Sequence, residues 1–298
     1  MTDRNTVLGY AAGAAAGISY GMNPLFAKHL LAEGVPVSFM LMFRYGIAMV
    51  IMLGWILLRK EKLSVNPKQA GILFVLGILF SASSLTLFQS YRFVPSGLAT
   101  TLVYLYPALV ALTMVFRGVF PSWQNWVAII ATFMGVAILS MPNGSQNFRW
   151  EGIAFACASA LVYAWYLVIV NVSGTIKGVS SHVLTFYALL VGTVWFSSMA
   201  AADNAFPTQV SFGAVEVGCL IGLAVFPTLI SLLTLAISTR KIGATRTSIL
   251  GVFEPLTAIL IGTCVFGEPF TIKVAAGAGI CISAIIFMII SPEKKQKV

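Results

Sequence analysis

Long runs of uncharged, mostly apolar residues follow one another along the chain, separated by short polar segments. Eight runs hold no Asp, Glu, Lys or Arg over at least 19 residues: 5–27, 69–91, 93–116, 118–148, 152–176, 178–202, 217–239 and 274–292. An α-helix needs about 20 residues to cross the hydrocarbon core of a bilayer. The runs lack the short alternating pattern of β-barrel strands. The pattern therefore predicts membrane-spanning helices.

Two further runs, 34–58 and 247–267, are each interrupted by a single charge, Arg44 in the first and Glu254 in the second. Counting them gives ten predicted spans and an all-α polytopic membrane protein. Composition agrees, because 59% of the residues are hydrophobic and only 9% are charged. Soluble domains carry about 25% charged residues.

The net charge of +9 reflects topology and does not call for a nucleic-acid partner. With ten spans and a cytoplasmic N-terminus, 13 of the 18 Lys and Arg residues fall on the cytoplasmic side. Cytoplasmic loops of membrane proteins carry such an excess of basic residues. We therefore expect a multi-pass protein of a bacterial inner (cytoplasmic) membrane, with both termini in the cytoplasm.

The chain contains a weak internal repeat. Tyr-Pro at 106–107 aligns with Glu-Pro at 254–255, and FPSW (120–123) aligns with EPFT (268–271). The predicted halves are 1–146 and 147–298, with five spans each. Because five is odd, the second half must enter the membrane inverted relative to the first, which is an architecture of secondary transporters.

Several segments resemble the EamA-type carriers of the drug/metabolite transporter superfamily. They are FRYGIAM in span two, SYRFVPSGLATTLVYLYP, its counterpart STRKIGATRTSILGVFEP, and the closing EPLTAILIGTCVFGEP. The resemblance covers nearly the whole chain. It implies a secondary carrier, often an exporter, with a central cavity lined by spans one to four and six to nine. It also implies that spans five and ten are peripheral.

Arg44 and Glu254 are the principal candidates for a substrate site. Each lies about eight or nine residues into its span, which places both near the bilayer midplane, where carriers of this kind bind substrate. A lone charge at that depth costs at least ~2.5 kcal/mol unless it is partnered or hydrated. Two alternatives stay open: the charges pair with each other or with backbone carbonyls, or Glu254 binds a cationic group or the coupling proton.

Hydroxyl, amide and aromatic residues in the same spans complete the predicted site. The substrate-binding candidates are Ser19, Tyr20, Asn23, Arg44, Gln89, Tyr104, Tyr106, Tyr163, Tyr166, Tyr187 and Glu254. Pro107 and Pro255 should break spans four and nine at this depth, because proline removes one helical hydrogen bond. Pro24 and Pro227 are expected to act similarly in spans one and eight.

Gly9, Gly13, Gly17 and Gly21 recur every four residues along span one. Such a face of small residues allows close approach of another helix. We expect it to serve internal packing, with a homodimer interface as the alternative. The chain is therefore expected to be a monomer or a homodimer.

The sequence lacks the residues that an enzymatic or metal-binding function would need. No Asp lies in a span, no HExxH motif or phosphate-binding glycine loop is present, and the four cysteines lack ligand spacing. We expect that the protein is not an enzyme and that it binds no metal or cofactor. The sequence favours a proton-coupled carrier that exports amino acids, related zwitterions or organic cations. The alternative is a facilitative uniporter or channel-like pore in which Arg44 and Glu254 are structural.

Overall fold

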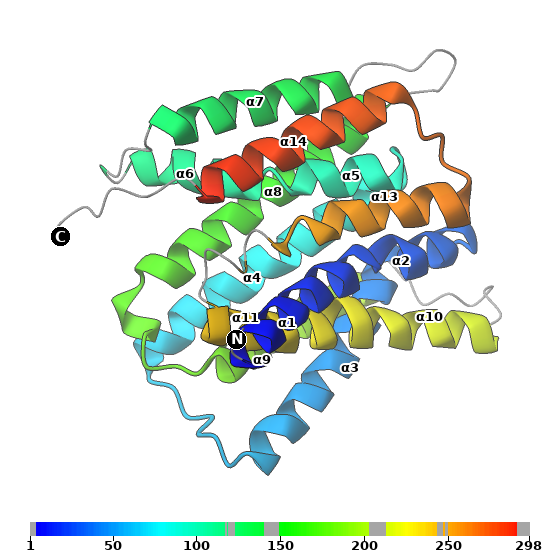
Figure 1. Ribbon diagram of the computed structural model, residues 1–298. Helices are drawn as coiled ribbons and strands as arrows, with labels where there is room; N and C mark the ends of the chain where they lie inside the picture. Colours follow the sequence, from blue (N-terminus) through cyan, green and yellow to red (C-terminus); the bar gives the residue numbers. More distant parts are fainter. Residues whose placement is uncertain are drawn as a thin grey trace.

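The computed structural model describes residues 4–116, 118, 123–139, 149–202, 213–242, 247 and 250–290. In these residues the regular secondary structure is entirely helical (Figure 1). The first half contains α1 (Arg4–Gly21), α2 (Asn23–Ala32), α3 (Val37–Leu58), α4 (Pro67–Ser90), α5 (Ser96–Val103), α6 (Tyr106–Val115) and α7 (Trp123–Leu139). The second contains α8 (Trp150–Val172), the 3₁₀-helix η1 (Gly174–Ile176), α9 (Ser181–Ala202), α10 (Ala214–Ala224), the π-helix η2 (Val225–Ile230), α11 (Ser231–Ile242), α13 (Phe253–Phe266) and α14 (Ile272–Ile290).

The apolar segments have the lengths that a membrane requires. Six are long and apolar enough to cross a bilayer: Val37–Leu58, Pro67–Ser90, Ser96–Val115, Trp150–Val170, Ser181–Ala202 and Ala214–Ser238. Shorter apolar stretches within α7, α13 and α14, together with the broken pair α1–α2, complete the ten spans. The predicted all-α polytopic membrane fold is confirmed. The predicted boundary between the halves, at 146–147, lies outside the described residues.

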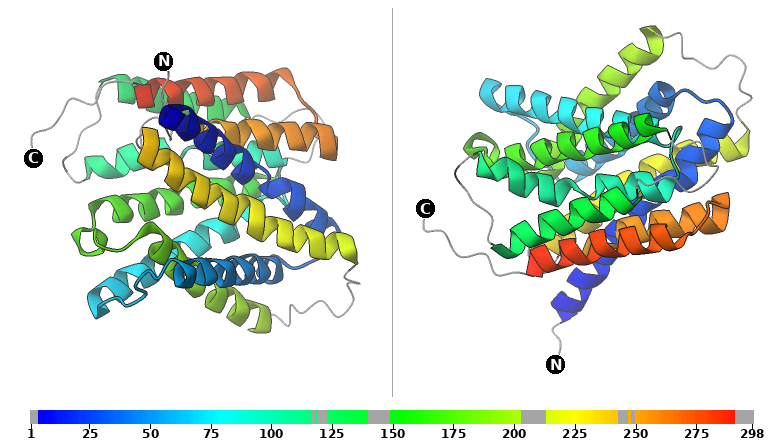
Figure 2. Two further views of the ribbon diagram at one scale, coloured as in Figure 1. Left: turned by 60° about the horizontal axis from the view of Figure 1, so that its bottom comes forward. Right: turned by 90° about the horizontal axis from the view of Figure 1, so that it is seen from above.

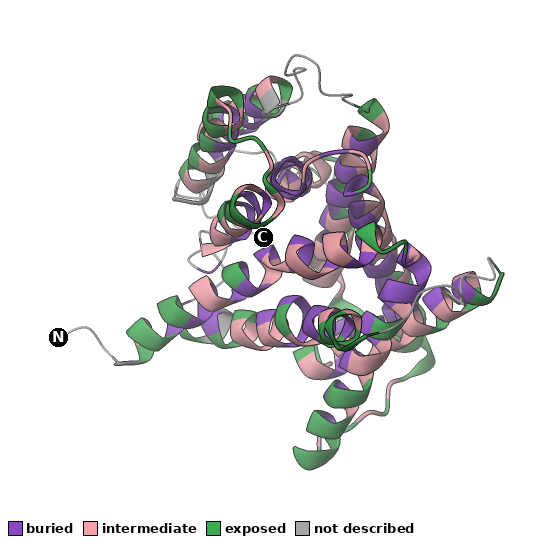
Figure 3. Cartoon of the chain, turned by 90° about the vertical axis from the view of Figure 1, so that its right-hand side faces the viewer, coloured by how far each residue is buried: buried purple, intermediate pink, exposed green. Residues whose placement is uncertain are grey.

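The outer faces of the helices remain apolar. Large side chains such as Val50, Phe74, Ile130, Val194 and Leu260 are exposed in the middle of their helices. Figure 3 shows exposed positions on the outward sides of the helices and buried positions toward the middle of the bundle. In a bilayer, the exposed apolar faces contact lipid.

Contacts between helices of the two halves occur in matching pairs, in which each helix is replaced by its equivalent from the other half. α1 of span one packs on α11 of span eight, and the equivalent α8 of span six packs on α4 of span three. Likewise α3 packs on α10, and its equivalent α9 packs on α4. The pairs α3–α9, α5–α13 and α7–α14 join equivalent spans of the two halves. This pairing is the pattern of two halves related by a pseudo-two-fold axis, and five spans per half would make such a repeat inverted.

Spans five and ten form a separate pair at one side of the bundle. α7 and α14 lie side by side in Figures 1 and 2, along one flank of the molecule. Their neighbours include α6 and α5, which are the two pieces of span four. The remaining spans pack around one another and hold the central residues described below.

Proline positions coincide with interruptions in four spans. Span one breaks at Met22 before Pro24, and span four breaks at Tyr104–Leu105 before Pro107. In span nine, α13 begins at Phe253 with Pro255 in its first turn, and Pro227 lies within the π-helix of span eight. A proline lacks the N–H that would continue the helical ladder, so the backbone turns or widens at these points.

Local sequence also sets where an uninterrupted helix begins. At the start of α4, the Asn66 side chain accepts from Gln69 N at 2.8 Å, and the Gln69 side chain accepts from Asn66 N at 3.0 Å. This reciprocal capping box satisfies two backbone donors that have no partner within the helix. Pro67 adds a preset backbone angle in the first turn. The same Gln69 donates to Thr175 O at 3.1 Å, which ties the α3–α4 side of the bundle to η1.

Candidate functional site

The Arg44 guanidinium lies in the interior of the bundle, with only 1% of the residue exposed. Its Nε donates to Thr228 Oγ1 and its Nη1 donates to Asn23 Oδ1, each at 2.9 Å. The guanidinium carbon lies 5.3 Å from the centre of the Phe88 ring, in cation–π range. The Arg44 guanidinium of α3 is thus held by side chains from the start of α2, from the π-helix and from α4.

The two acceptors of Arg44 are available because their helices are interrupted. Asn23 is the first residue of α2, directly after the break at Met22, and its Nδ2 donates to Tyr20 O at 3.0 Å. Thr228 follows Pro227 in the π-helix and donates its hydroxyl to Leu223 O at 3.0 Å. The broken spans therefore aim polar side chains at Arg44.

The Glu254 carboxyl group is in a different environment. Glu254 is 9% exposed and lies in the first turn of α13. The N-terminus of a helix carries partial positive charge, which favours a carboxylate there. Within the described part of the chain, no ion pair of 4.0 Å or less joins Glu254 to Arg44 or to any other basic side chain. The direct Arg44–Glu254 pair, left open by the sequence, does not occur in this arrangement.

Tyrosines from several spans interact electrostatically with Glu254. Its charge lies within electrostatic range of five tyrosine hydroxyls, those of Tyr20, Tyr91, Tyr104, Tyr106 and Tyr163. Tyr20 also lies within range of Arg44, so the two opposite charges flank the same side chain. Phenol hydroxyls can donate to a carboxylate, and phenol faces attract cations.

The aromatic rings continue as a connected series away from Glu254. The ring of Tyr106 lies edge-on to those of Tyr104 at 5.8 Å and Tyr163 at 5.0 Å. Tyr163 stacks on Tyr166 at 5.8 Å, and Tyr166 is followed by Phe80 at 5.5 Å. These separations are typical of favourable aromatic pairs. Spans three, four and six thus contribute one continuous aromatic surface.

The predicted site residues fall into two groups. Tyr20, Asn23, Arg44, Tyr104, Tyr106, Tyr163, Tyr166 and Glu254 are linked by the contacts above, and buried Ser19 lies just before the break in span one. Two others form bonds elsewhere. Gln89 Oε1 accepts from Arg92 at 3.3 Å at the end of α4, and the Tyr187 hydroxyl donates to Leu63 O at 2.9 Å. The substrate-binding role of all these residues stays a prediction.

Sequence reasoning missed Thr228 and Tyr45. The Tyr45 hydroxyl lies 2.7 Å from Ser84 Oγ, and its ring lies 5.8 Å from Phe80, which extends the aromatic series to α3. A hydroxyl directly after a proline within an apolar span was the available signal for Thr228. Tyr45 is adjacent to Arg44 in the sequence but had no other distinguishing pattern.

Comparison with known proteins agrees with the geometry. The profile of the EamA-like transporter family matches twice, over residues 7–141 and 150–290. An uncharacterized inner membrane transporter of Escherichia coli, YedA, is 22% identical over 88% of this chain and 85% of its own length. An S-adenosylmethionine uptake transporter of Rickettsia bellii is 26% identical over 93% of this chain and 91% of its own.

A solved protein structure shares the fold, with a TM-score of 0.64, 17% identity, and coverage of 96% of both chains. The membrane-spanning helices and these relatives identify a multi-pass inner-membrane transporter. With the family profile matched in both halves, the chain belongs to the EamA-like transporter family.

Proposed function

We propose that this protein is a secondary active transporter that exports small organic metabolites by proton-coupled alternating access. The expected substrates are amino acids, related zwitterions or organic cations. One observation carries the proposal: Glu254 is buried and, within the described residues, has no basic side chain at ion-pair distance. Such a carboxylate is available for a cationic group or a proton.

The surroundings of Glu254 favour positive over negative substrates. Tyrosine faces attract organic cations, and a carboxylate strengthens that preference. Phosphate recognition usually recruits arginine or lysine side chains. Arg44 is almost completely buried and already donates to Asn23 and Thr228. A polyanion therefore has no accessible cluster of donors among the described residues of the central site.

A zwitterion fits the same charges. Tyr20 lies within electrostatic range of both Arg44 and Glu254, so an ammonium group near Glu254 and a carboxylate oriented toward Arg44 complement the field there. The R. bellii relative is named for S-adenosylmethionine, an amino acid that also carries a sulfonium cation. That relative is named for uptake, so transport by this chain should be measured in both directions.

Alternating access follows from the two-fold architecture. Two inverted halves can pack in two nearly equivalent ways, each open to one side of the membrane. The interruptions at Met22, at Tyr104–Leu105 and in the π-helix give three spans points at which to bend. Competition between a proton and the substrate for Glu254 would couple the two fluxes. In this proposal both termini lie in the cytoplasm.

A facilitative uniporter or channel-like pore is the second candidate. The position of Glu254 in the first turn of α13 favours it, because the helix N-terminus can stabilise the carboxylate with no substrate involved. Trans-stimulated exchange and saturation distinguish a carrier from a pore, and a response to a pH gradient distinguishes coupled from facilitative transport.

The test is flux in proteoliposomes with an imposed pH gradient, comparing the native chain with Glu254→Gln over a panel of amino acids and organic cations. We expect the native chain to concentrate a substrate against its gradient. Glu254→Gln should retain exchange of a zwitterion at lower affinity, because the amide oxygen can still accept from an ammonium group. It should lose at least about 90% of the gradient-driven component, since the amide cannot carry the coupling proton.

Glu33→Gln is the matched control, because Glu33 is an exposed carboxylate between α2 and α3. Its pH response should equal that of the native chain. If Glu254→Gln responds to the gradient like this control, Glu254 is not the coupling group. Saturable exchange that ignores the gradient in the native chain would favour the uniporter.

A further inference from the structure

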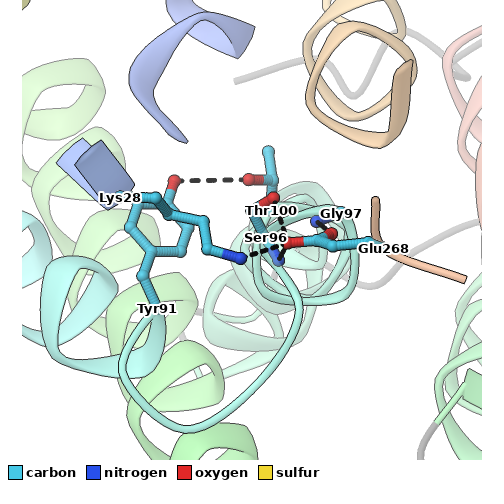
Figure 4. Close-up of polar contacts among 6 residues, drawn as sticks. All are labelled: Lys28, Tyr91, Ser96, Gly97, Thr100 and Glu268. Carbon is cyan, nitrogen blue, oxygen red and sulfur yellow. Dashed lines mark hydrogen bonds and ion pairs between the residues drawn. The ribbon is translucent and has the colours of Figure 1, made fainter. Parts of the chain in front are cut away.

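A second acidic residue, Glu268, joins three parts of the bundle (Figure 4). It follows Gly267, which ends α13 with a left-handed backbone (φ +63°). Its carboxylate forms an ion pair with Lys28 of α2 and accepts from Ser96 N at 2.9 Å, Ser96 Oγ at 2.8 Å and Gly97 N at 3.4 Å. One side chain thus fastens α2, the start of α5 and the end of α13 to one another.

The surrounding residues are shaped for this carboxylate. A Cβ added at Gly262 would lie 2.2 Å from Glu268 Oε2, so any larger residue there would displace the carboxylate. The Lys28 ammonium also lies 5.0 Å from the centre of the Phe266 ring, in cation–π range. Ser96 and Gly97 contribute backbone donors that the α5 helix cannot satisfy internally. Glu268 is therefore held by contacts from two other segments, α2 and the start of α5.

This cluster lies on the way to the central site. One turn further along α5 from Ser96, the Thr100 Oγ1 lies 3.3 Å from the Tyr91 hydroxyl, and both residues are buried; Figure 4 draws this contact next to the cluster. Tyr91 is in turn within electrostatic range of Tyr20, Glu254 and Arg44. Successive turns of α5 thus carry Ser96 at the Lys28–Glu268 pair, then Thr100, and then Tyr104 at the break in span four.

The sequence supplies the carboxylate of this cluster in the second half but not at the equivalent position of the first. In the alignment of the two halves, Phe120 occupies the position equivalent to Glu268. The first half therefore lacks the carboxylate that would build an equivalent cluster at the opposite end. α2 can move as a unit, because it is separated from α1 by the break at Met22.

We propose that the Lys28–Glu268 ion pair is the latch of a gate formed by α2, α5 and α13, and that its release opens the central site toward this end. The inference rests on the proposed alternating-access function. The latch stabilises the state closed at this end, and Phe120, at the equivalent position of the first half, cannot form the same ion pair. Removing the Lys28–Glu268 ion pair should shift the population of molecules toward the state open at this end, even when no substrate is present.

Thiol labelling of a buried reporter tests the latch. The four native cysteines are replaced by alanine, and Thr100→Cys is introduced one turn along α5 from Ser96. Labelling by a membrane-impermeant thiol reagent, added at the Lys28–Glu268 end, then reports opening. Lys28→Met should raise the labelling rate about five-fold, as expected for loss of a partly exposed ion pair, and Glu268→Gln should raise it at least as much. Lys28→Arg should label at nearly the native rate.

Arg92→Met is the matched control, because Arg92 is also a cation and is exposed. Among the contacts described, its side chain hydrogen-bonds only to Gln89 of the adjoining helix α4. Size-exclusion profiles check that each variant is folded. If Lys28→Met labels no faster than Arg92→Met, the latch is overturned. If only Glu268→Gln accelerates labelling, Glu268 is merely the cap of α5, and the latch is overturned too. Because labelling needs no substrate, it decides whether the latch exists even for a protein that fails every flux assay.

Discussion

Arg44 and Glu254 meet the difficulty of a charge in the membrane interior in different ways. Arg44 is almost fully buried and hydrogen-bonded to two side chains. Glu254 lies in the first turn of α13, within electrostatic range of Tyr20, and in the described chain has no ion-pair partner. The arginine is therefore suited to fixing the geometry of α2, α3 and the π-helix, and the glutamate is suited to chemistry that changes during transport.

Arg44→Lys should destabilise the protein although it keeps the charge. A lysine ammonium cannot reproduce the planar fork that reaches Asn23 and Thr228 at once. Losing a buried hydrogen bond to a charged group lowers the free energy of unfolding by about 1.5–3 kcal/mol. Denaturant unfolding in detergent micelles measures the change. Arg92→Lys, an exposed change just beyond the end of α4, should stay within about 0.5 kcal/mol of the native value. Equal stability of the two variants would contradict the structural role of Arg44.

The sequence revealed both central charges but not their partners. Each stands alone in an apolar run, which makes it conspicuous. Thr228, the partner of Arg44, lies 184 residues away, and only the packing of α3 against span eight brings the two together. For the same reason the sequence could not separate Tyr187, which bonds to Leu63 O, from the tyrosines around Glu254.

At the scale of elements, α1 approaches its neighbours through its glycines. A Cβ at Gly9 would lie 2.5 Å from Ile242, and one at Gly13 would lie 2.4 Å from Leu250. At Gly21 it would lie 2.5 Å from the backbone oxygen of Glu254. The expected internal packing of this face is thus observed. Span one therefore meets span nine directly at the residue proposed to bind substrate.

Gly21→Ala should damage the central site. A methyl group cannot fit 2.5 Å from a backbone oxygen, so α1 and α13 must separate. Overpacking of this kind costs about 1–3 kcal/mol, and displacement of Glu254 should reduce substrate exchange. Unfolding in micelles and exchange in proteoliposomes measure the two effects.

Gly54→Ala is the control for helix propensity. No atom lies within 4 Å of a Cβ at Gly54 in α3. The change should be neutral or stabilise the helix by up to about 1 kcal/mol. If Gly21→Ala behaves like Gly54→Ala, the close contact between spans one and nine does not constrain the site.

The uncharged runs and the proline positions predicted most of the membrane-spanning segments. They did not predict where each span divides into separate helices. The runs locate the spans because lipid excludes charge over a fixed thickness. Pro107 and Pro255 indicated interruptions near the middle of spans four and nine. The widened turn of η2 could not be foreseen, because proline permits a kink, a break or a π-turn and neighbouring helices select among them.

At the scale of the whole molecule, the repeat predicted the arrangement better than its low sequence similarity suggested. Five spans per half force an inverted orientation, and the observed contacts exchange between the halves as that orientation requires. What the repeat could not supply is the difference between the halves. α8 runs without interruption where α1 and α2 are separate helices, so span six lacks the break that span one carries.

The proposed topology can be tested by labelling single cysteines from either side of the membrane. Lys62→Cys and Lys177→Cys, in segments that connect spans two to three and six to seven, should react only from the cytoplasm. Glu33→Cys and Arg92→Cys should react only from the opposite side. All four positions are exposed. The basic residues favour this orientation because translocation selects against positive loops.

In intact cells, impermeant reagent should therefore modify only the second pair, and permeabilisation should expose the first. The reverse pattern would invert the protein and place the Lys28–Glu268 latch on the cytoplasmic side. Reaction of one member of each pair would contradict the span assignment itself.

The π-helix at Val225–Ile230 affects how span eight responds to changes in the length of the chain, and not only to changes in its chemistry. A π-turn holds more residues than the α-turn it replaces. Deleting one residue there would restore an ordinary α-turn and keep the following α11 nearly in phase with α10. Deleting one residue at the start of α11 would instead turn the rest of that helix by about 100° about its axis. Ser238 would then leave its 2.8 Å contact with Thr247, and the face that meets the glycines of α1 would point elsewhere. A single-residue deletion in the π-turn should therefore be tolerated more readily than one at the start of α11.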